Sequence, residues 1–304
     1  MSDPTIQPDP SQIGGISQAP FVRLPDPASL FAQRSARFAM ADPADPLAPY
    51  LAFLSALANA QDAVLAGLSD PAMPAEDAVA RAREFTMPPL DRGLFKPDAA
   101  LWQTFERLFE ALDPVPKPET AQAALAKLRA ADPAALSAMV TTVLSSSIPA
   151  ETMAEHIYIA AGLQVHFARM AARLDPKRLV PIETGICPAC GGPPTSSMVV
   201  GWPGADGARY AFCSLCATLW NEVRIKCLVC GSTKGISYRG LDGDAGKIKA
   251  ECCDECGSYV KILYEHKDVR LDPVADDVAS LGLDILLRDS TYRRGGFNPY
   301  LQGY

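Results

Sequence analysis

The sequence predicts an α+β protein in which an N-terminal all-helical domain precedes two tandem ribbon modules and a C-terminal helix. Each ribbon is expected to be rubredoxin-like or zinc-ribbon-like, with four cysteines around one metal ion. Two observations lead to this prediction. Residues 1–186 contain no cysteine, and the 9 cysteines form closely spaced pairs, with one extra residue, between 187 and 256.

The expected boundaries follow changes in composition along the chain. They are 1–20 for a disordered tail, 21–180 for the helical domain, 181–226 for the first ribbon, 227–270 for the second, and 271–304 for a C-terminal helix and tail. The first 20 residues hold four prolines and few large apolar side chains, which is typical of segments that bury no core.

Apolar side chains recur at helical spacing between residues 27 and 174. Pro27 opens one amphipathic segment, and Pro46 opens a second with a broad apolar stripe. Further helices are expected at 97–111, 118–131, 133–146 and 150–174. Proline-rich stretches at 86–89 and 113–118 indicate connectors. Helices of this kind with proline between them predict a bundle.

The cysteines form a tandem repeat. The first set is Cys187, Cys190, Cys213 and Cys216, and the second is Cys227, Cys230, Cys253 and Cys256. In each set 22 residues separate two C-x2-C pairs, and the second set is the first shifted by 40 positions. Other residues keep the same shift, because Gly191 corresponds to Gly231 and Arg209 to Lys249.

Each C-x2-C turn brings two sulfurs to one ion, and a hairpin between the pairs returns the chain so that four sulfurs meet. Strands are therefore expected at 197–201, 208–212 and 218–225 in the first ribbon, and at 236–241, 248–252 and 259–264 in the second. One more helix is expected at 272–287, followed by a glycine-rich tail from Gly295.

Two metal ions held by four thiolates each are favoured over disulfides or free thiols, because four pairs with matching gaps suit tetrahedral sites. Pairing between the two units is geometrically allowed but ignores their equal lengths. Zinc and iron suit such ligands equally, and closed sites indicate structure or electron transfer. Cys252 corresponds to Phe212, which favours an ordinary strand residue over a reactive thiol.

The other candidate residues favour packing. His156 and His166 lie ten positions apart in one predicted helix, and we expect packed or partly exposed residues rather than ligands. His266 is expected at the surface, and Trp220 and Trp202 are expected in ribbon-core and hairpin packing rather than in a stacking platform. Ser/His/Asp arrangements, nucleotide loops and paired acids do not occur at usable spacing.

Charge and hydropathy bear on partners and location. The net charge is −7, with 13 basic and 15 acidic residues after position 180, which disfavours nucleic acid as a partner. A locally basic strip is more easily explained as a solvated hairpin face; it comprises Arg224, Lys226, Lys234, Arg239, Lys247 and Lys249. The sequence has no apolar run long enough for membrane insertion and no secretory signal at its start, which predicts a cytoplasmic protein.

The sequence resembles the FdhE family of formate dehydrogenase accessory proteins from about residue 21 onward. The matching stretches are ICPACGGPPTSSMV (186–199), CSLCATLWNEVRIKCLVC (213–230), KAECCDECGSYVKILYEHK (249–267), VADDVASLGL (274–283) and PLAPYLAFLSALANAQ (46–61). Each C-x2-C pair of the family is present, and Cys252 lies outside that motif.

The resemblance implies a cytoplasmic assembly factor and not an enzyme. Family members are needed for active respiratory formate dehydrogenase, contact its catalytic subunit before twin-arginine export and are described as binding iron in a rubredoxin-like manner. The resemblance therefore favours iron, with zinc as the alternative. Two other functions stay open from the residues alone: a nucleic-acid-binding ribbon protein, and a rubredoxin-like electron-transfer or redox-sensing protein.

Overall fold

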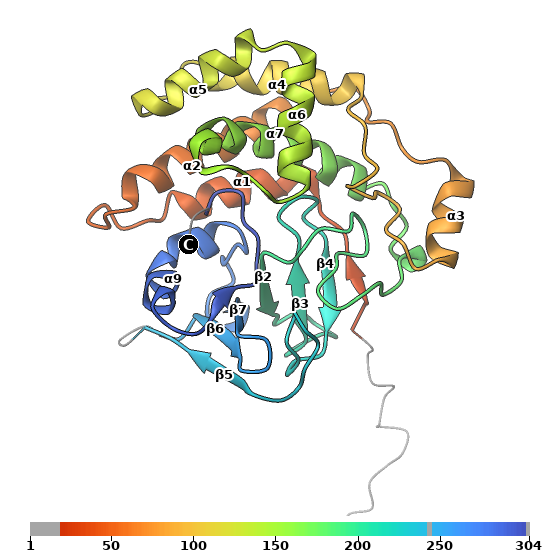
Figure 1. The fold of residues 1–304 in the computed structure, drawn as a ribbon, viewed down its shortest axis with the longest axis vertical. Helices are drawn as coiled ribbons and strands as arrows, with labels where there is room; N and C mark the ends of the chain where they lie inside the picture. The colour runs from red at the N-terminus through yellow and green to blue at the C-terminus, as the bar shows by residue number, and fades with distance from the viewer. Residues whose placement is uncertain (1–18, 242–244, 302–304) are drawn as a thin grey trace, which may run out of the picture.

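The computed structural model describes residues 19–241 and 245–301. In Figure 1 the helices that precede residue 172 form a layer above a sheet whose strands, apart from a two-residue strand near the start of the chain, follow residue 195. This arrangement confirms the predicted fold class. The disordered tail expected at 1–20 lies outside the described residues, except for its last two positions.

The helices predicted between residues 27 and 174 are confirmed. They are α1 (Pro27–Phe38), α2 (Ala48–Val64), α4 (Ala99–Leu112), α5 (Glu119–Ala130), α6 (Pro133–Leu144) and α7 (Met153–Ala171). Helix α7 is buried along almost its whole length, because α2, α4, α5 and α6 pack around it. Gly162 permits the close approach of α4, since a methyl group there would overlap the Phe105 ring.

Helix α3 (Glu76–Glu84) was not predicted, and it has no buried residue. Its sequence lacks an apolar stripe, and its stabilising features are local. Two acidic residues lie in the first turn and two arginines in the last, and Arg81 forms an ion pair with Asp77 at 3.0 Å. In Figure 1 α3 stands beside the bundle rather than within it.

Within the described residues, the strands form one eight-stranded sheet. They are β1 (Val22–Arg23), β2 (Ser196–Val199), β3 (Arg209–Phe212), β4 (Leu219–Glu222), β5 (Ile236–Arg239), β6 (Ile248–Cys253), β7 (Ser258–Tyr264) and β8 (Arg293–Arg294). The order is β1-β4-β3-β2-β7-β6-β5, with β8 also paired to β7. The six predicted ribbon strands are confirmed, whereas β1 and β8 are too short to give a periodic pattern.

The two ribbons are joined into this sheet by β2 and β7, which pair in parallel with Ser197 opposite Ile262. An ion pair reinforces the joint, because Arg209 of β3 contacts Glu251 of β6 at 2.7 Å with both side chains buried. The sequence predicted the ribbons as two modules. The joint between them depends on pairing between residues that are 65 positions apart in the sequence, such as Ser197 and Ile262, which local patterns do not encode.

The single helix predicted at 272–287 is wrong in detail. The structure has α8 (Ala275–Ala279) and α9 (Leu281–Arg288), separated at Ser280, whose hydroxyl donates to the carbonyl of Asp276. This region binds the helical layer through α1, where Arg34 contacts Asp272 at 3.2 Å and Arg37 contacts Asp276 at 2.7 Å. None of the described helices combines the length and apolar character that crossing a membrane requires.

Candidate metal centre

The first cluster consists of Cys187, Cys190, Cys213 and Cys216. Their Sγ atoms all lie within 4.8 Å of one another, and two pairs across the ribbon, Cys187–Cys216 and Cys190–Cys213, are each 3.5 Å apart. A tetrahedral ion with metal–sulfur bonds of about 2.3 Å places its sulfurs roughly 3.8 Å apart. The four sulfurs are therefore spaced to hold one such ion after a small outward shift.

The second cluster consists of Cys227, Cys230, Cys253 and Cys256. Its sulfurs also lie within 4.8 Å of one another, with Cys227–Cys256 and Cys230–Cys253 each at 3.7 Å. The structure thus brings together the two sets of four cysteines that the sequence groups by spacing. Metal binding by these eight residues is a proposal that the geometry supports.

All four C-x2-C turns share one backbone design. The residue after the second cysteine has a positive φ and donates its N–H to the carbonyl of the first cysteine. These residues are Gly191, Ala217, Gly231 and Gly257, with φ between 57° and 76°. Ala217 is the exception to glycine, in a conformation that side chains rarely adopt. The turn also points amides at sulfur, since the N–H of Val229 donates to Cys227 Sγ at 3.3 Å.

The two clusters differ in their surroundings. The cysteines of the first cluster are at most 1% exposed, whereas Cys230 and Cys256 of the second cluster reach the surface. The first cluster is enclosed because it lies against the helical layer. There, residues 88–92 form a docking loop that binds the first C-x2-C turn: Leu90 N donates to the Ala189 carbonyl at 2.9 Å, and Arg92 N to the Cys190 carbonyl at 3.1 Å.

The thiol environments suit a cation. Burial raises the pKa of Cys187 well above its ordinary value, and hydrogen bonding to Cys187 and the other thiols raises the pKa of Cys190. Burial likewise raises the pKa of Cys227 to about 12. Four adjacent thiolates repel one another, and a divalent ion removes that repulsion and releases the protons. The donor set therefore fits zinc or iron.

The remaining sequence candidates lie away from the clusters. Cys252 is buried on β6, opposite Tyr259 of β7, and is not part of either group of sulfurs, as predicted. His156 and His166 are both buried in α7, and His266 is exposed. Trp220 is buried beside β1, and Trp202 is half-buried with its N–H donating to Glu265. The buried histidines and the two tryptophans agree with packing roles, and His266 lies at the surface as expected.

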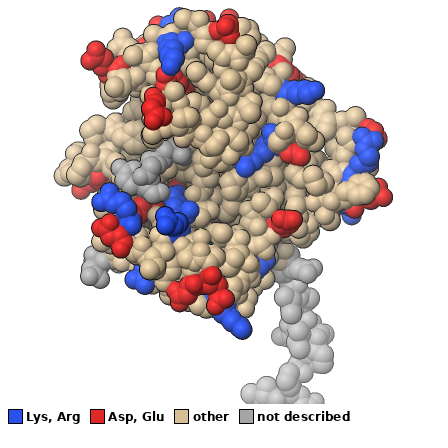
Figure 2. Space-filling model, viewed as in Figure 1, with Lys and Arg blue, Asp and Glu red and all other residues tan. Residues whose placement is uncertain are grey.

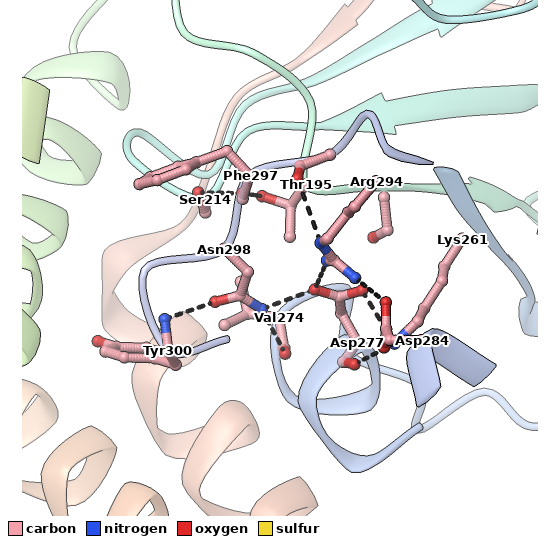
Figure 3. Close-up of polar contacts among 12 residues, drawn as sticks. Thr195, Ser214, Lys261, Val274, Asp277, Asp284, Arg294, Phe297, Asn298 and Tyr300 are labelled. Atoms are coloured by element: carbon pink, nitrogen blue, oxygen red, sulfur yellow. Dashed lines mark hydrogen bonds and ion pairs between the residues drawn. The ribbon is translucent and has the colours of Figure 1, made fainter. Parts of the chain in front are cut away.

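The structure also reveals a segment that the sequence did not mark as important. Residues 292–301, here called the C-terminal strap, include the start of the predicted glycine-rich tail. The strap packs against the rest of the protein, and its residues Asn298, Tyr300 and Leu301 are buried. Figure 3 shows Arg294 between Asp277 and Asp284, and the Phe297 carbonyl facing Thr195 and Ser214. The adjacent glycines at 295 and 296 were the one sequence feature that could have indicated close packing of this segment, because a methyl group at either position would overlap a neighbouring residue.

Three sequence profiles of one family match successive parts of the chain. "FdhE, N-terminal" matches residues 19–184, "FdhE, central domain" matches 186–224 and "FdhE, C-terminal domain" matches 225–301. The central match contains the first cluster and the C-terminal match contains the second. Together they span the helical layer and both ribbons.

Individual proteins agree with the profile matches. A "Protein FdhE homolog" of Rhizobium meliloti is 49% identical over 306 aligned residues, which cover all of both chains. "Protein FdhE" of Escherichia coli O9:H4 is 37% identical over 234 residues and 74% of each chain. The crystal structure of the FdhE protein from Pseudomonas aeruginosa has a TM-score of 0.83 and 32% identity, covering 93% of this chain and 99% of that one.

Proposed function

The chain belongs to the FdhE family, and from this membership we propose that it is an accessory protein needed for an active formate dehydrogenase. In this proposal it is an assembly factor rather than an enzyme. It binds the catalytic subunit of a respiratory formate dehydrogenase in the cytoplasm, before that subunit is exported. The observation that carries the proposal is the likeness to an FdhE homolog over the full length of both chains.

We infer further that each cysteine cluster binds one metal ion, with all eight paired cysteines as ligands. The sulfur spacings of 3.5 to 3.7 Å support this inference. A bound ion supplies a rigid link between the two C-x2-C turns of its ribbon, and strands this short need such a link to fold firmly. The family resemblance favours iron, and four thiolates accept zinc equally well.

The proposal predicts that a strain lacking the gene loses membrane-bound formate-oxidising activity. The wild-type gene restores that activity, and a Cys187→Ser/Cys190→Ser variant fails to restore it, because the first cluster then lacks two ligands. The Cys252→Ala variant is the matched control, since this cysteine is buried in the same sheet but lies outside both clusters. It is expected to restore activity as the wild type does.

Immunoblots establish that each variant accumulates in the cell. The binding step is tested by asking whether the tagged chain co-purifies with the catalytic subunit that has not yet been exported. Formate oxidation that is unaffected by loss of the gene would show that the chain serves another client. Activity restored by the double cysteine variant would show that the first cluster is dispensable.

Two rival functions receive less support. The basic strip is partly neutralised, because Lys226 pairs with Glu222 at 3.5 Å and Lys247 with Asp268 at 3.0 Å. Figure 2 shows positive and negative side chains interspersed over the visible face, which offers little to nucleic acid. A redox-sensing role depends on iron in the clusters, and its test is a reversible one-electron couple in the iron-loaded protein.

A further inference from the structure

The second cluster is the more accessible of the two, and the C-terminal strap lies on both of its C-x2-C turns. Arg293 N donates to the carbonyl of Gly257, the residue after Cys256, at 2.7 Å. Gly295 lies against Val229, between Cys227 and Cys230, so closely that a methyl group at 295 would overlap the valine. Tyr292 also donates its hydroxyl to Asp254, next to Cys253.

The same strap continues over the first ribbon to the helical layer. The Phe297 carbonyl accepts hydrogen bonds from the hydroxyls of Thr195 at 2.9 Å and Ser214 at 3.1 Å, and Ser214 is next to Cys213. Further on, the Tyr300 hydroxyl donates to Gln164 of α7 at 2.7 Å. In Figure 3 the strap runs without a break from Arg294 to Tyr300. One ten-residue segment therefore contacts residues beside both clusters and the central helix.

We propose that the second cluster is the exchangeable metal site of this protein, and that its ion acts as a latch for the C-terminal strap. With the ion in place, both turns are fixed and the strap docks on them. When the ion leaves, the turns at 227–230 and 253–257 lose the link that holds their conformation, and the strap loses its contacts there. The strap loosens rather than detaches, because Arg294 stays bound to Asp277 and Asp284.

Linkage makes this coupling reciprocal. If the ion favours the docked strap, the docked strap favours the ion by the same factor, wherever along the strap the docking is weakened. Weakening the far end at Tyr300 should therefore lower the affinity of the second cluster for an ion that Tyr300 does not touch. The strap also contacts the first ribbon at Thr195 and Ser214, but the docking loop covers the first cluster from another side, so loosening of the strap alone is not expected to release the inner ion.

The experiment uses the full-length protein loaded with two zinc ions and mixed with excess colorimetric chelator. We expect one equivalent of zinc to leave in a fast phase, and the second to leave only as urea unfolds the chain. The Cys230→Ser variant lacks one ligand of the second cluster. We expect it to carry only one equivalent of zinc before the chelator is added, and therefore to show no fast phase. Hydrogen exchange at the amides of Arg293 and Gly295 should quicken roughly tenfold after the fast phase, within the usual range of coupling between sites.

The test of long-range coupling is the Tyr300→Phe variant, which loses only the hydroxyl that bonds Gln164. In competition with a chelator of known affinity, its second cluster should bind zinc roughly two- to tenfold more weakly than that of the wild type, the effect expected of one hydrogen bond. Tyr158→Phe is the matched control, because it removes a hydroxyl bond from the same helix, to the Ala121 carbonyl, without contacting the strap. Its zinc affinity should match the wild type.

Three results would overturn the proposal. They are release of both ions in one phase, unchanged exchange at Arg293 and Gly295 after the first ion has left, and equal zinc affinities of the second cluster in Tyr300→Phe and Tyr158→Phe. If Tyr300→Phe does not fold, the release and exchange measurements on the wild type decide the question alone.

Discussion

His166 shows how strongly the surroundings of one residue differ from what its position in a sequence reveals. The sequence predicted a packed or partly exposed helix residue, and the structure buries the side chain completely against Phe95 and Phe167. Burial lowers its pKa to about 4, although nearby Asp98, 3.6 Å away, opposes this shift. Arg169 on the same helix adds to it. The imidazole is therefore neutral at pH 7.

The lowered pKa of His166 leads us to expect that the stability of the protein depends on pH. Its pKa in the folded state lies below its ordinary value near 6.5, so the unfolded chain binds more protons between pH 6.5 and 4. The free energy of unfolding should therefore fall as the pH falls through this window, by at most about 3 kcal/mol from this group. Urea unfolding of wild type and His166→Gln at pH 7 and 4.5 measures the difference.

The His166→Gln variant should lose less stability than the wild type over that pH interval. His266→Gln is the control, since His266 is exposed, and it should retain the wild-type dependence. Equal pH dependence in all three proteins would mean that the pKa of His166 is the same in the folded and unfolded states.

Residues whose partners are local in sequence were predictable, and those with distant partners were not. The eight paired cysteines could be grouped because each C-x2-C turn and hairpin is a local structure. Gly192 could not be recognised in the same way. A methyl group on it would lie 3.2 Å from Cys213 Sγ, a constraint that appears only when the ribbon closes. Arg92 reaches the first cluster from the other domain.

Elements with a strong apolar face were predictable, whereas those defined by neighbours were missed. Helix α4 has an apolar stripe and was expected almost to the residue. Helix α3 buries nothing, and β1 consists of two residues that become a strand by pairing with β4. The pattern of 272–287 was helical throughout, but Ser280 interrupts it because its hydroxyl bonds the backbone of the preceding turn.

A network of buried charged side chains joins two strands, β7 and β8, to two helices, α8 and α9. Lys261 of β7 and Arg294 of β8 contact Asp277 of α8 and Asp284 of α9, and all four side chains are at most 8% exposed. Tyr259 adds a hydrogen bond to Asp284 at 2.7 Å. Two acids and two bases balance, so each buried charge depends on the others.

Removal of one base should therefore be costly. We expect Arg294→Met to lower the free energy of unfolding by about 3–5 kcal/mol, because it leaves two buried carboxylates with one cation. Arg293→Met is the control. The Arg293 side chain is exposed, so its replacement should lower the free energy of unfolding far less. Urea unfolding followed by circular dichroism gives both values, and equal losses would contradict this account of the network.

At the scale of the whole molecule, the two ribbons behave as parts of one sheet. The family profiles divide them at residue 224, but the β2–β7 pairing and the buried Arg209–Glu251 ion pair cross that division. The domain limits predicted from composition remain predictions. The sequence could identify two similar units, and it could not show their contact, which depends on long-range strand pairing.

A double-mutant cycle on Arg209 and Glu251 tests this joint. Each single change to methionine should lower the free energy of unfolding by about 3–5 kcal/mol, because one buried charge is left unpaired. The double variant should lose clearly less than the sum of the single losses. Additive losses would show that the two residues stabilise their own ribbons separately. Circular dichroism during urea unfolding provides the measurement.

The enclosure of the first cluster has a consequence for the order of events during synthesis. Its cysteines are covered on one side by the docking loop, which the ribosome produces about one hundred residues before the first C-x2-C pair, and on the other by the strap, which is produced last. Any ion that this cluster holds must therefore enter before the two halves of the chain close on each other. Metal supply at the moment of folding, rather than afterwards, decides whether the inner cluster is filled.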